Sequence, residues 1–207
     1  MKATKLSLLA IAVMVIASGC LTSEEPFYQE SDIKVDDRLV GTYVDESDHS
    51  KSPTLFYVSR VGDFDHRGQY YITVASKPGC EMKFGAVLFQ ISTNRFLDML
   101  PQLEACDDVP ASPPSLLGLL KSATLQPLHM AVKVEVSTNG VKLDFATHPA
   151  LVAAATKFPQ YFQPLKPGRF PRMIADAKRQ REFLLRFGGE TNLFKPSELR
   201  RETPPSK

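Results

Sequence analysis

Short runs of apolar residues, separated by turn-forming residues, make up most of the chain between residues 38 and 146. They read RLVGTYV, TLFYVSRV, GQYYITVA, MKFGAVLFQIS, RFLDML, LHMAVKVEV and GVKLDFA. The alternation is clearest in LHMAVKVEV, where Met130 and Val132 fall on one face and Lys133 falls on the other. Short strands with no long helix between them predict an antiparallel β-barrel or sandwich.

A hairpin is predicted between the last two of these runs. The dipeptide Asn139-Gly140 lies between LHMAVKVEV and VKLDF. A type I′ turn needs a positive φ at both central residues, and this dipeptide is the common solution. We therefore expect the two runs to be neighbouring antiparallel strands.

Two helices are expected after the strands. The first begins near Thr147, has Pro149 in its first turn and continues through ALVAAATKF. The second runs from about Pro171 to Phe187 and ends at Gly188-Gly189. The predicted fold class is therefore mainly β with C-terminal helices (α+β).

The first nineteen residues show the pattern of an export signal. Lys2 and Lys5 are followed by an apolar run, from Leu6 to Ala17, that is too short to cross the roughly 30 Å hydrocarbon core of a membrane. The run ends in the small residues of VIASGC, directly before the thiol of Cys20. An ordinary secretory signal, with Cys20 as an accidental neighbour, is the alternative interpretation.

The stretch VIASGC resembles the lipobox of bacterial lipoproteins. The resemblance implies that Cys20 takes a diacylglycerol, that the chain is cut before it and that the new amine is acylated. Leu21 stands where an Asp would retain such a protein at the inner membrane, so the resemblance favours the outer membrane, facing the periplasm. Several acyl chains give a durable hold.

The resulting division of the chain has four parts. Residues 1–19 are the signal peptide, and the polar, acidic residues 20–37 are expected to form a flexible tether. Residues 38–190 form a single β-rich domain with its helices, and residues 191–207 form a C-terminal extension with a frayed tail. About 188 residues remain after cleavage, enough for one sizeable core.

The cysteine count favours lipidation over an ordinary secretory signal. The chain has three cysteines, and lipidation of Cys20 leaves Cys80 and Cys106 as one possible pair. Their disulfide would close a loop of about 27 residues, worth roughly 3 kcal/mol in the chain-entropy model. The alternative, a pair of metal ligands, lacks a nearby Cys or His at a suitable spacing.

Charge gives no general attraction to nucleic acid. Without Lys2 and Lys5 the chain has 23 Lys and Arg and 23 Asp and Glu. The distribution is uneven, because the stretch from Lys157 to Lys207 has 12 basic against 5 acidic residues. This segment either packs on the acidic remainder of the chain or forms a patch for an acidic envelope component.

No pattern in the sequence indicates catalysis, a metal or a cofactor. The chain has no nucleophile elbow, phosphate-binding Gly loop or dinucleotide fingerprint, and no two of its four histidines have metal-binding spacing. DFDHRG begins like a calcium loop, but Arg67 and Val74 stand where ligands are needed. We therefore expect a protein that is not an enzyme.

The stretch DDRLVGTYV resembles the first strand of lipocalin-like barrels, which carries G-x-W. Gly41-Thr42-Tyr43 takes that place, and the resemblance implies that Tyr43 closes one end of the barrel. The alternative is that Gly41 relieves crowding and Tyr43 is an ordinary core residue.

A barrel of about eight strands either is filled by side chains or holds one small ligand. The candidate ligand-binding residues are Tyr43, Tyr57, Tyr70, Tyr71, Phe84 and Phe89. The expected function is non-catalytic binding of a small apolar ligand or an envelope component by a lipid-anchored protein. Protein–protein interaction or assembly in the cell envelope is the alternative.

Overall fold

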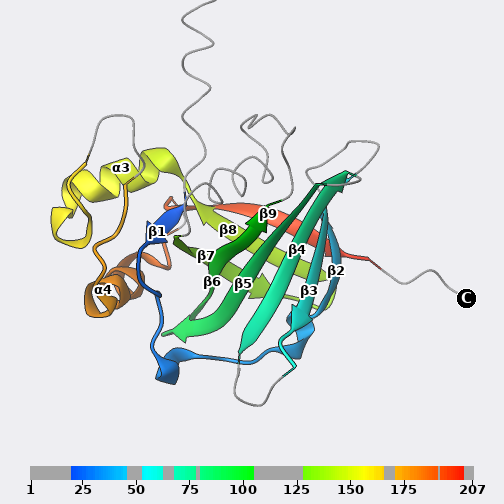
Figure 1. The fold of residues 1–207 in the computed structure, drawn as a ribbon. Helices are drawn as coiled ribbons and strands as arrows, with labels where there is room; N and C mark the ends of the chain where they lie inside the picture. The colour runs from blue at the N-terminus through cyan, green and yellow to red at the C-terminus, as the bar shows by residue number, and fades with distance from the viewer. Residues whose placement is uncertain are drawn as a thin grey trace, which may run out of the picture.

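The computed structural model describes residues 20–45, 53–62, 68–77, 80–104, 128–165, 171–190 and 192–202. Its centre is a closed barrel of eight antiparallel strands, each paired with the next along the chain (Figure 1). The eight strands are β2 (Gly41–Asp45), β3 (Leu55–Arg60), β4 (Gln69–Lys77), β5 (Cys80–Ile91), β6 (Asn94–Glu104), β7 (His129–Val136), β8 (Gly140–Ala146) and β9 (Phe194–Arg201). The prediction of a mainly β fold is confirmed, as a barrel consistent with the lipocalin-like architecture.

Strand β9 closes the barrel. It pairs with β2 through Tyr43 and Arg201, and with β8 through Val141 and Leu199. The sequence predicts a C-terminal extension over residues 191–207. The structure differs, because this segment contains a barrel strand whose residues Leu199 and Phe194 are both buried. The two helices therefore lie between the last two strands of the barrel, not after all of them.

The hairpin between β7 and β8 is present, but its turn differs from the predicted one. Ser137 N–H donates to the Gly140 carbonyl over 2.9 Å, so the loop residues are Thr138 and Asn139. Neither they nor Gly140 has a positive φ. Glycine is needed at 140 for another reason, because a Cβ there would lie 2.2 Å from the Leu199 carbonyl oxygen of β9.

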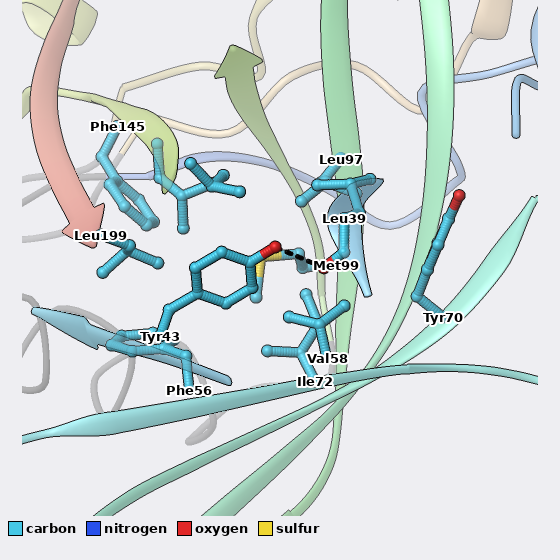
Figure 2. A pocket seen from close by; sticks show the side chains of 12 residues that line it. Leu39, Tyr43, Phe56, Val58, Tyr70, Ile72, Leu97, Met99, Phe145 and Leu199 are labelled. Atoms are coloured by element: carbon cyan, nitrogen blue, oxygen red, sulfur yellow. Dashed lines mark hydrogen bonds between the residues drawn. The ribbon is translucent and has the colours of Figure 1, made fainter. Parts of the chain in front are cut away.

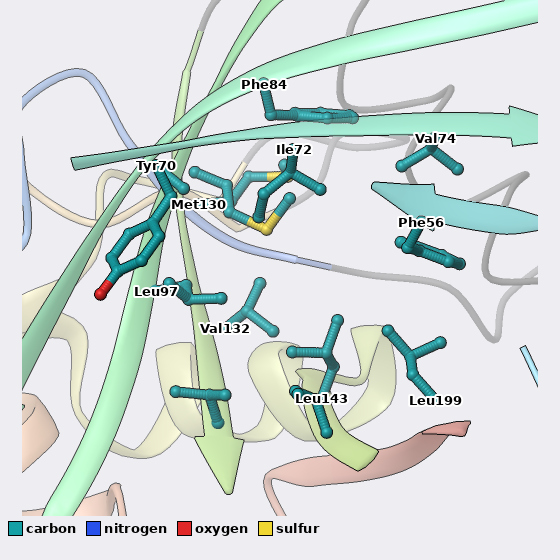
Figure 3. Packing of buried hydrophobic residues seen from close by; sticks show 14 of the residues in the cluster. Phe56, Tyr70, Ile72, Val74, Phe84, Leu97, Met130, Val132, Leu143 and Leu199 are labelled. Atoms are coloured by element: carbon teal, nitrogen blue, oxygen red, sulfur yellow. The ribbon is translucent and has the colours of Figure 1, made fainter. Parts of the chain in front are cut away.

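The apolar side chains form two separate clusters. The inner core fills the barrel and is built from alternate strand residues such as Phe84, Met130 and Val132 (Figure 3). The outer core lies outside the barrel wall, where outward residues of β5, β6 and β7 meet the helices. Its central rings are Phe89, Phe96, Phe162, Phe183 and Phe187.

Both predicted helices are present. Helix α3 (His148–Lys157) follows the extended residue Thr147 and has Pro149 in its first turn, as expected. Helix α4 (Ala177–Phe187) begins later than predicted, at Asp176, whose carboxylate accepts hydrogen bonds from two backbone N–H groups of the first turn. No helix within the described residues is long and apolar enough to span a bilayer.

The predicted tether is packed against the barrel. Leu21 to Ser23 form β1, which pairs with β7 outside the ring of eight strands. Leu21 and Phe27 are fully buried in the outer core, and Asp32 forms an ion pair with Arg181 of α4. The prediction of a flexible segment over residues 20–37 is therefore wrong from Leu21 onward, because its apolar residues each find a partner surface.

Candidate functional site

The six predicted ligand-binding residues do not come together. Tyr43, Tyr70 and Phe84 point into the inner core, where each is at most 1% exposed. Phe89 faces the other way and belongs to the outer core. The remaining two, Tyr57 and Tyr71, lie on the outer surface with exposed fractions of 43% and 47%. Three of the six predicted residues therefore face the barrel interior, and their role in ligand binding stays a prediction.

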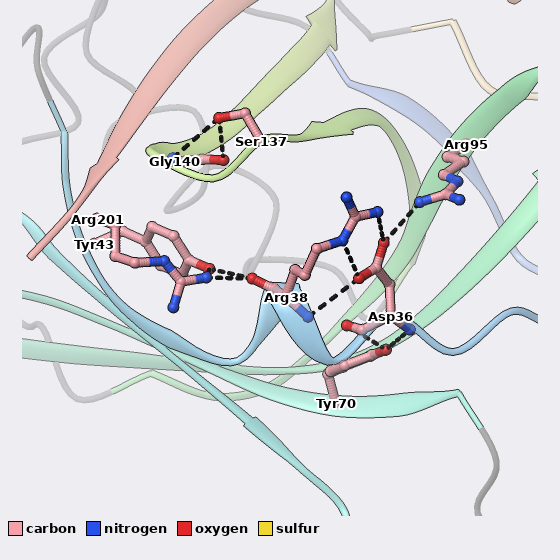
Figure 4. Close-up of polar contacts among 8 residues, drawn as sticks. All are labelled: Asp36, Arg38, Tyr43, Tyr70, Arg95, Ser137, Gly140 and Arg201. Carbon is pink, nitrogen blue, oxygen red and sulfur yellow. Dashed lines mark hydrogen bonds and ion pairs between the residues drawn. The ribbon is translucent and has the colours of Figure 1, made fainter.

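Tyr43 seals one end of the barrel together with Arg201 (Figure 4). Its hydroxyl lies 2.9 Å from the carbonyl oxygens of Arg38 and Leu39 and accepts a hydrogen bond from Arg201 Nη2 over 2.9 Å. The guanidinium also lies over the Tyr43 ring, 5.1 Å from its centroid. Burial raises the pKa of Tyr43, and Arg201 opposes that shift.

A short segment, Asp36–Leu39, covers this end, and we call it the end plug. The Asp36 carboxylate accepts hydrogen bonds from Arg38 Nη2 over 2.6 Å and from Arg95 Nη1 over 2.7 Å. These bonds, above all those from Arg38, lower the pKa of Asp36 to about 2. Tyr70 completes the contact, since its hydroxyl accepts from Asp36 N–H over 2.9 Å (Figure 4).

The barrel interior holds a cavity of about 20 Å³ behind the end plug (Figure 2). Leu39, Tyr43 and Tyr70 are among its apolar lining residues. This volume is sufficient for about one water molecule, whereas pockets for small organic ligands enclose roughly 300 to 1,000 Å³. The side chains of the inner core therefore fill the described part of the interior, and the predicted ligand cavity is not supported.

The outer wall formed by β2, β3 and β4 has a different character. The described outward side chains at its centre are uncharged, and we call this surface the tyrosine wall. It consists of Thr42, Val44, Leu55, Tyr57, Ser59, Tyr71, Thr73 and Ala75. Tyr57 and Tyr71 lie on neighbouring strands, two register positions apart. Charged residues flank the wall, with Glu81 and Lys83 on β5 and Arg200 on β9.

A buried carboxylate and an imidazole meet outside the barrel, between β6 and β7. His129 Nδ1 lies 3.0 Å from Asp98, whose carboxylate also accepts from Phe27 N–H over 3.3 Å. Burial disfavours the charged imidazole, but the Asp98 carboxylate outweighs it and raises the pKa of His129. For Asp98, burial disfavours the charged carboxylate and raises its pKa.

This pair resembles two members of a catalytic triad, but among the described residues no activated nucleophile accompanies it. Ser23 is the register partner of His129, so the two side chains share a face. Its Oγ instead accepts hydrogen bonds from Gln180 Nε2 over 2.7 Å and from Glu25 N–H over 3.1 Å. The pair therefore fastens the N-terminal segment to the barrel wall.

The structure describes one of the three cysteine side chains. Cys20 is buried against the inner core, and this burial raises its pKa to about 12. Cys106 and the side chain of Cys80 lie outside the described residues, so their disulfide stays a prediction. Within the described ranges, no three His, Cys, Asp or Glu residues gather as metal ligands.

The sequence analysis missed the polar residues that seal the barrel. Arg201 lay in the supposed extension, and its place opposite Tyr43 depends on pairing between the first and last strands of the ring. Asp98 and His129 were also missed. The alternation along β6 and β7 shows only that both side chains point outward, and it does not show that α4 and the N-terminal segment cover that outer face. Comparisons with protein-family models, curated proteins and solved structures found no match for this chain.

Proposed function

We propose that this protein is a lipid-anchored, non-catalytic binding protein of the cell envelope, and that it binds a protein partner through the tyrosine wall. One observation carries the proposal: the described interior is filled, while Tyr57 and Tyr71 are exposed on adjacent strands. The cavity in the described part of the barrel is too small for a ligand-binding function inside the barrel.

The composition of the tyrosine wall favours a protein as the partner. Tyrosine is enriched among the residues that contribute most to binding at protein interfaces, where an uncharged centre is surrounded by a polar rim. Tyr57 is flanked by Thr42 and Thr73 across the two strand pairs, and the described outward charges nearest to the wall lie on the neighbouring strands β5 and β9. The cross-linking test described next also detects a homodimer, in which the partner is a second copy of the chain.

The test places a photo-cross-linking residue at position 57 of the full chain in intact cells. We expect one discrete adduct, and we expect no such adduct from position 156, an exposed site on α3. The Tyr57→Ser/Tyr71→Ser variant should weaken binding to the purified partner at least 100-fold, since each interface tyrosine contributes on the order of 2 kcal/mol. Unchanged affinity in that variant would contradict the proposal, and an adduct of twice the chain mass would identify a homodimer.

The proposed anchor is the acylated Cys20, which the lipobox resemblance supports. Because the Cys20 side chain is buried in the folded chain, the proposal requires diacylglycerol transfer to precede the packing of β1. The barrel cavity has no space for an acyl chain, so the modified side chain leaves the inner core and lies at the surface beside β1.

The intact mass of the N-terminal peptide, isolated from membranes, tests the anchor. We expect a Cys20 terminus with acyl chains, released from membranes by detergent and not by high salt. Cys20→Ser should leave an unprocessed precursor. An unmodified Cys20, or a different terminus, would overturn the assignment.

A further inference from the structure

We infer that the face formed by α3 and α4 lies against the bilayer and binds anionic lipid headgroups. This inference rests on the proposed lipid anchor. Cys20 directly precedes β1, so no linker separates the acylated residue from the folded barrel. The acyl chains therefore leave the molecule at β1.

Helix α4 and the segment that leads to it form hydrogen bonds with β1. The Thr22 carbonyl accepts a hydrogen bond from Met173 N–H over 2.9 Å, and Gln180 Nε2 donates to Ser23 Oγ over 2.7 Å. Both helices lie on the side of the barrel that carries β1, whereas β2, β3 and β4 lie on the opposite side (Figure 1). A bilayer that holds the acyl chains thus meets the helices and leaves the tyrosine wall exposed.

This helical face carries three cations that have no acidic partner among the described residues. Within the described residues, no carboxylate lies within 4 Å of the side-chain nitrogens of Lys157, Lys178 or Arg186, while the other two arginines of α4 have ion pairs. Lys157 and Arg186 are both held near the Phe158 ring, 5.2 Å and 5.1 Å from its centroid. Unpaired cations near a membrane surface are attracted to anionic lipids.

A mainly apolar groove of about 210 Å³ runs between the two helices, and its polar lining residues are Lys157, Glu190 and Asn192. Phe158, Phe183 and Phe187 line it, and Ala150 and Ala154 of α3 form its other wall. Leu185 is 50% exposed on the outer face of α4. Cations around an apolar surface match the chemistry of a lipid, which presents a phosphate next to hydrocarbon.

The chain has no tryptophan, so a single introduced one reports its own surroundings. We would place Leu185→Trp or Tyr57→Trp in the full lipidated protein and reconstitute it in vesicles that contain brominated phosphatidylcholine, with or without phosphatidylglycerol. We expect the bromine to quench the Leu185→Trp probe more strongly with phosphatidylglycerol present, and to leave the Tyr57→Trp probe unquenched.

Charge variants then test the cations. Lys157→Gln and Arg186→Gln should each weaken the docking of the helical face about fivefold, whereas the matched control Lys83→Gln on β5 should have no effect. Strong quenching of the Tyr57→Trp probe, or no effect of the two charge variants, would overturn the inference. Soluble glycerol phosphate should not undock the helical face from the vesicle. Undocking by this compound would also contradict the inference, since the ligand would then be a free phosphate.

The anchor and this inference fail in different ways. An unmodified Cys20 mass contradicts the anchor, on which the inference depends. A lipidated protein whose Leu185→Trp probe is not quenched contradicts the orientation alone.

Discussion

The inner and outer cores are of similar size but arise from different features of the chain. The inner core comes from every second residue of eight strands, a period that is visible in the sequence. The outer core draws on the N-terminal segment, the five barrel strands β5 to β9 and two helices. Its aromatic rings contact one another, as in the Phe183–Phe187 pair at 4.9 Å. A barrel strand that is apolar on both faces therefore marks the place where other elements cover the wall.

Removal of β9 should have the largest effect, because this strand contributes Leu199 to the inner core and Phe194 to the outer core. We expect a chain that ends after Glu190 to lose cooperative unfolding, as measured by circular dichroism during urea denaturation. A chain that ends after Glu202 keeps the strand and serves as the control. Cooperative unfolding of the shorter chain would show that neither core needs β9.

Large-to-small substitutions compare the two cores directly. Phe84→Ala in the inner core and Phe183→Ala in the outer core should each lower the free energy of unfolding by about 3 to 5 kcal/mol, since both side chains are fully buried. The exposed Leu185→Ala should lower it by less than about 1 kcal/mol. Because strands β5 to β7 belong to both cores, we expect one unfolding transition; two transitions in Phe183→Ala would show that the outer core unfolds alone.

The seal at the end plug allows a subtler change to the inner core. Tyr43→Phe keeps the ring but removes the hydroxyl, which leaves one Arg201 donor and the Leu39 carbonyl with fewer partners. We expect a loss of about 1 to 3 kcal/mol in the free energy of unfolding. Tyr71→Phe on the exposed wall is the matched control, and an equal loss in both variants would show that the seal has no special role.

Titration should affect the outer layer, where Asp98 and His129 meet beside Glu25. The Asp98 carboxylate raises the pKa of His129 in the folded state, so the stabilisation is fully present below the unfolded value of about 6.5. It is lost as the pH rises through the raised folded value. We expect the protein to be more stable at about pH 6 than at about pH 8.5.

The control for that prediction is His129→Gln, which cannot titrate. The difference in unfolding free energy between the two pH values should shrink in this variant. An unchanged difference would assign the pH dependence to other groups, and the effect is the smallest of the four.

The strands and helices with a clear local signal could be predicted from the sequence. Met130 and Val132 alternate with Lys133 as expected, and Thr147 with Pro149 correctly marks the start of α3. Strand β9 could not be predicted, because Pro196 and the charges of FKPSELRR are untypical of a central strand. The structure explains the proline: within the described residues β2 pairs with residues 199–201 alone, so Pro196 has no described strand partner on that side.

The supposed site shows a further limit of sequence reasoning. The six aromatic residues are all plausible ligand contacts, but strand parity sends Tyr57 and Tyr71 outward and Tyr43, Tyr70 and Phe84 inward. The inward or outward direction of each side chain could have been predicted from the alternation of apolar and polar residues along each strand. The coverage of Phe89 by the N-terminal segment could not, because that contact joins elements far apart in the chain and has no period of its own.

The position of β9 also sets the order in which the molecule can be completed. Tyr43 and Arg201 are 158 residues apart, and the ring between them stays open until the C-terminal strand is available. In a chain that emerges from a translocation channel with its N-terminus first, β2 and β8 present unpaired edges throughout that time. High contact order makes such closure slow and exposes the edges to aggregation. If the chain is exported as proposed, we therefore expect it to depend on holding factors during export more than its size suggests.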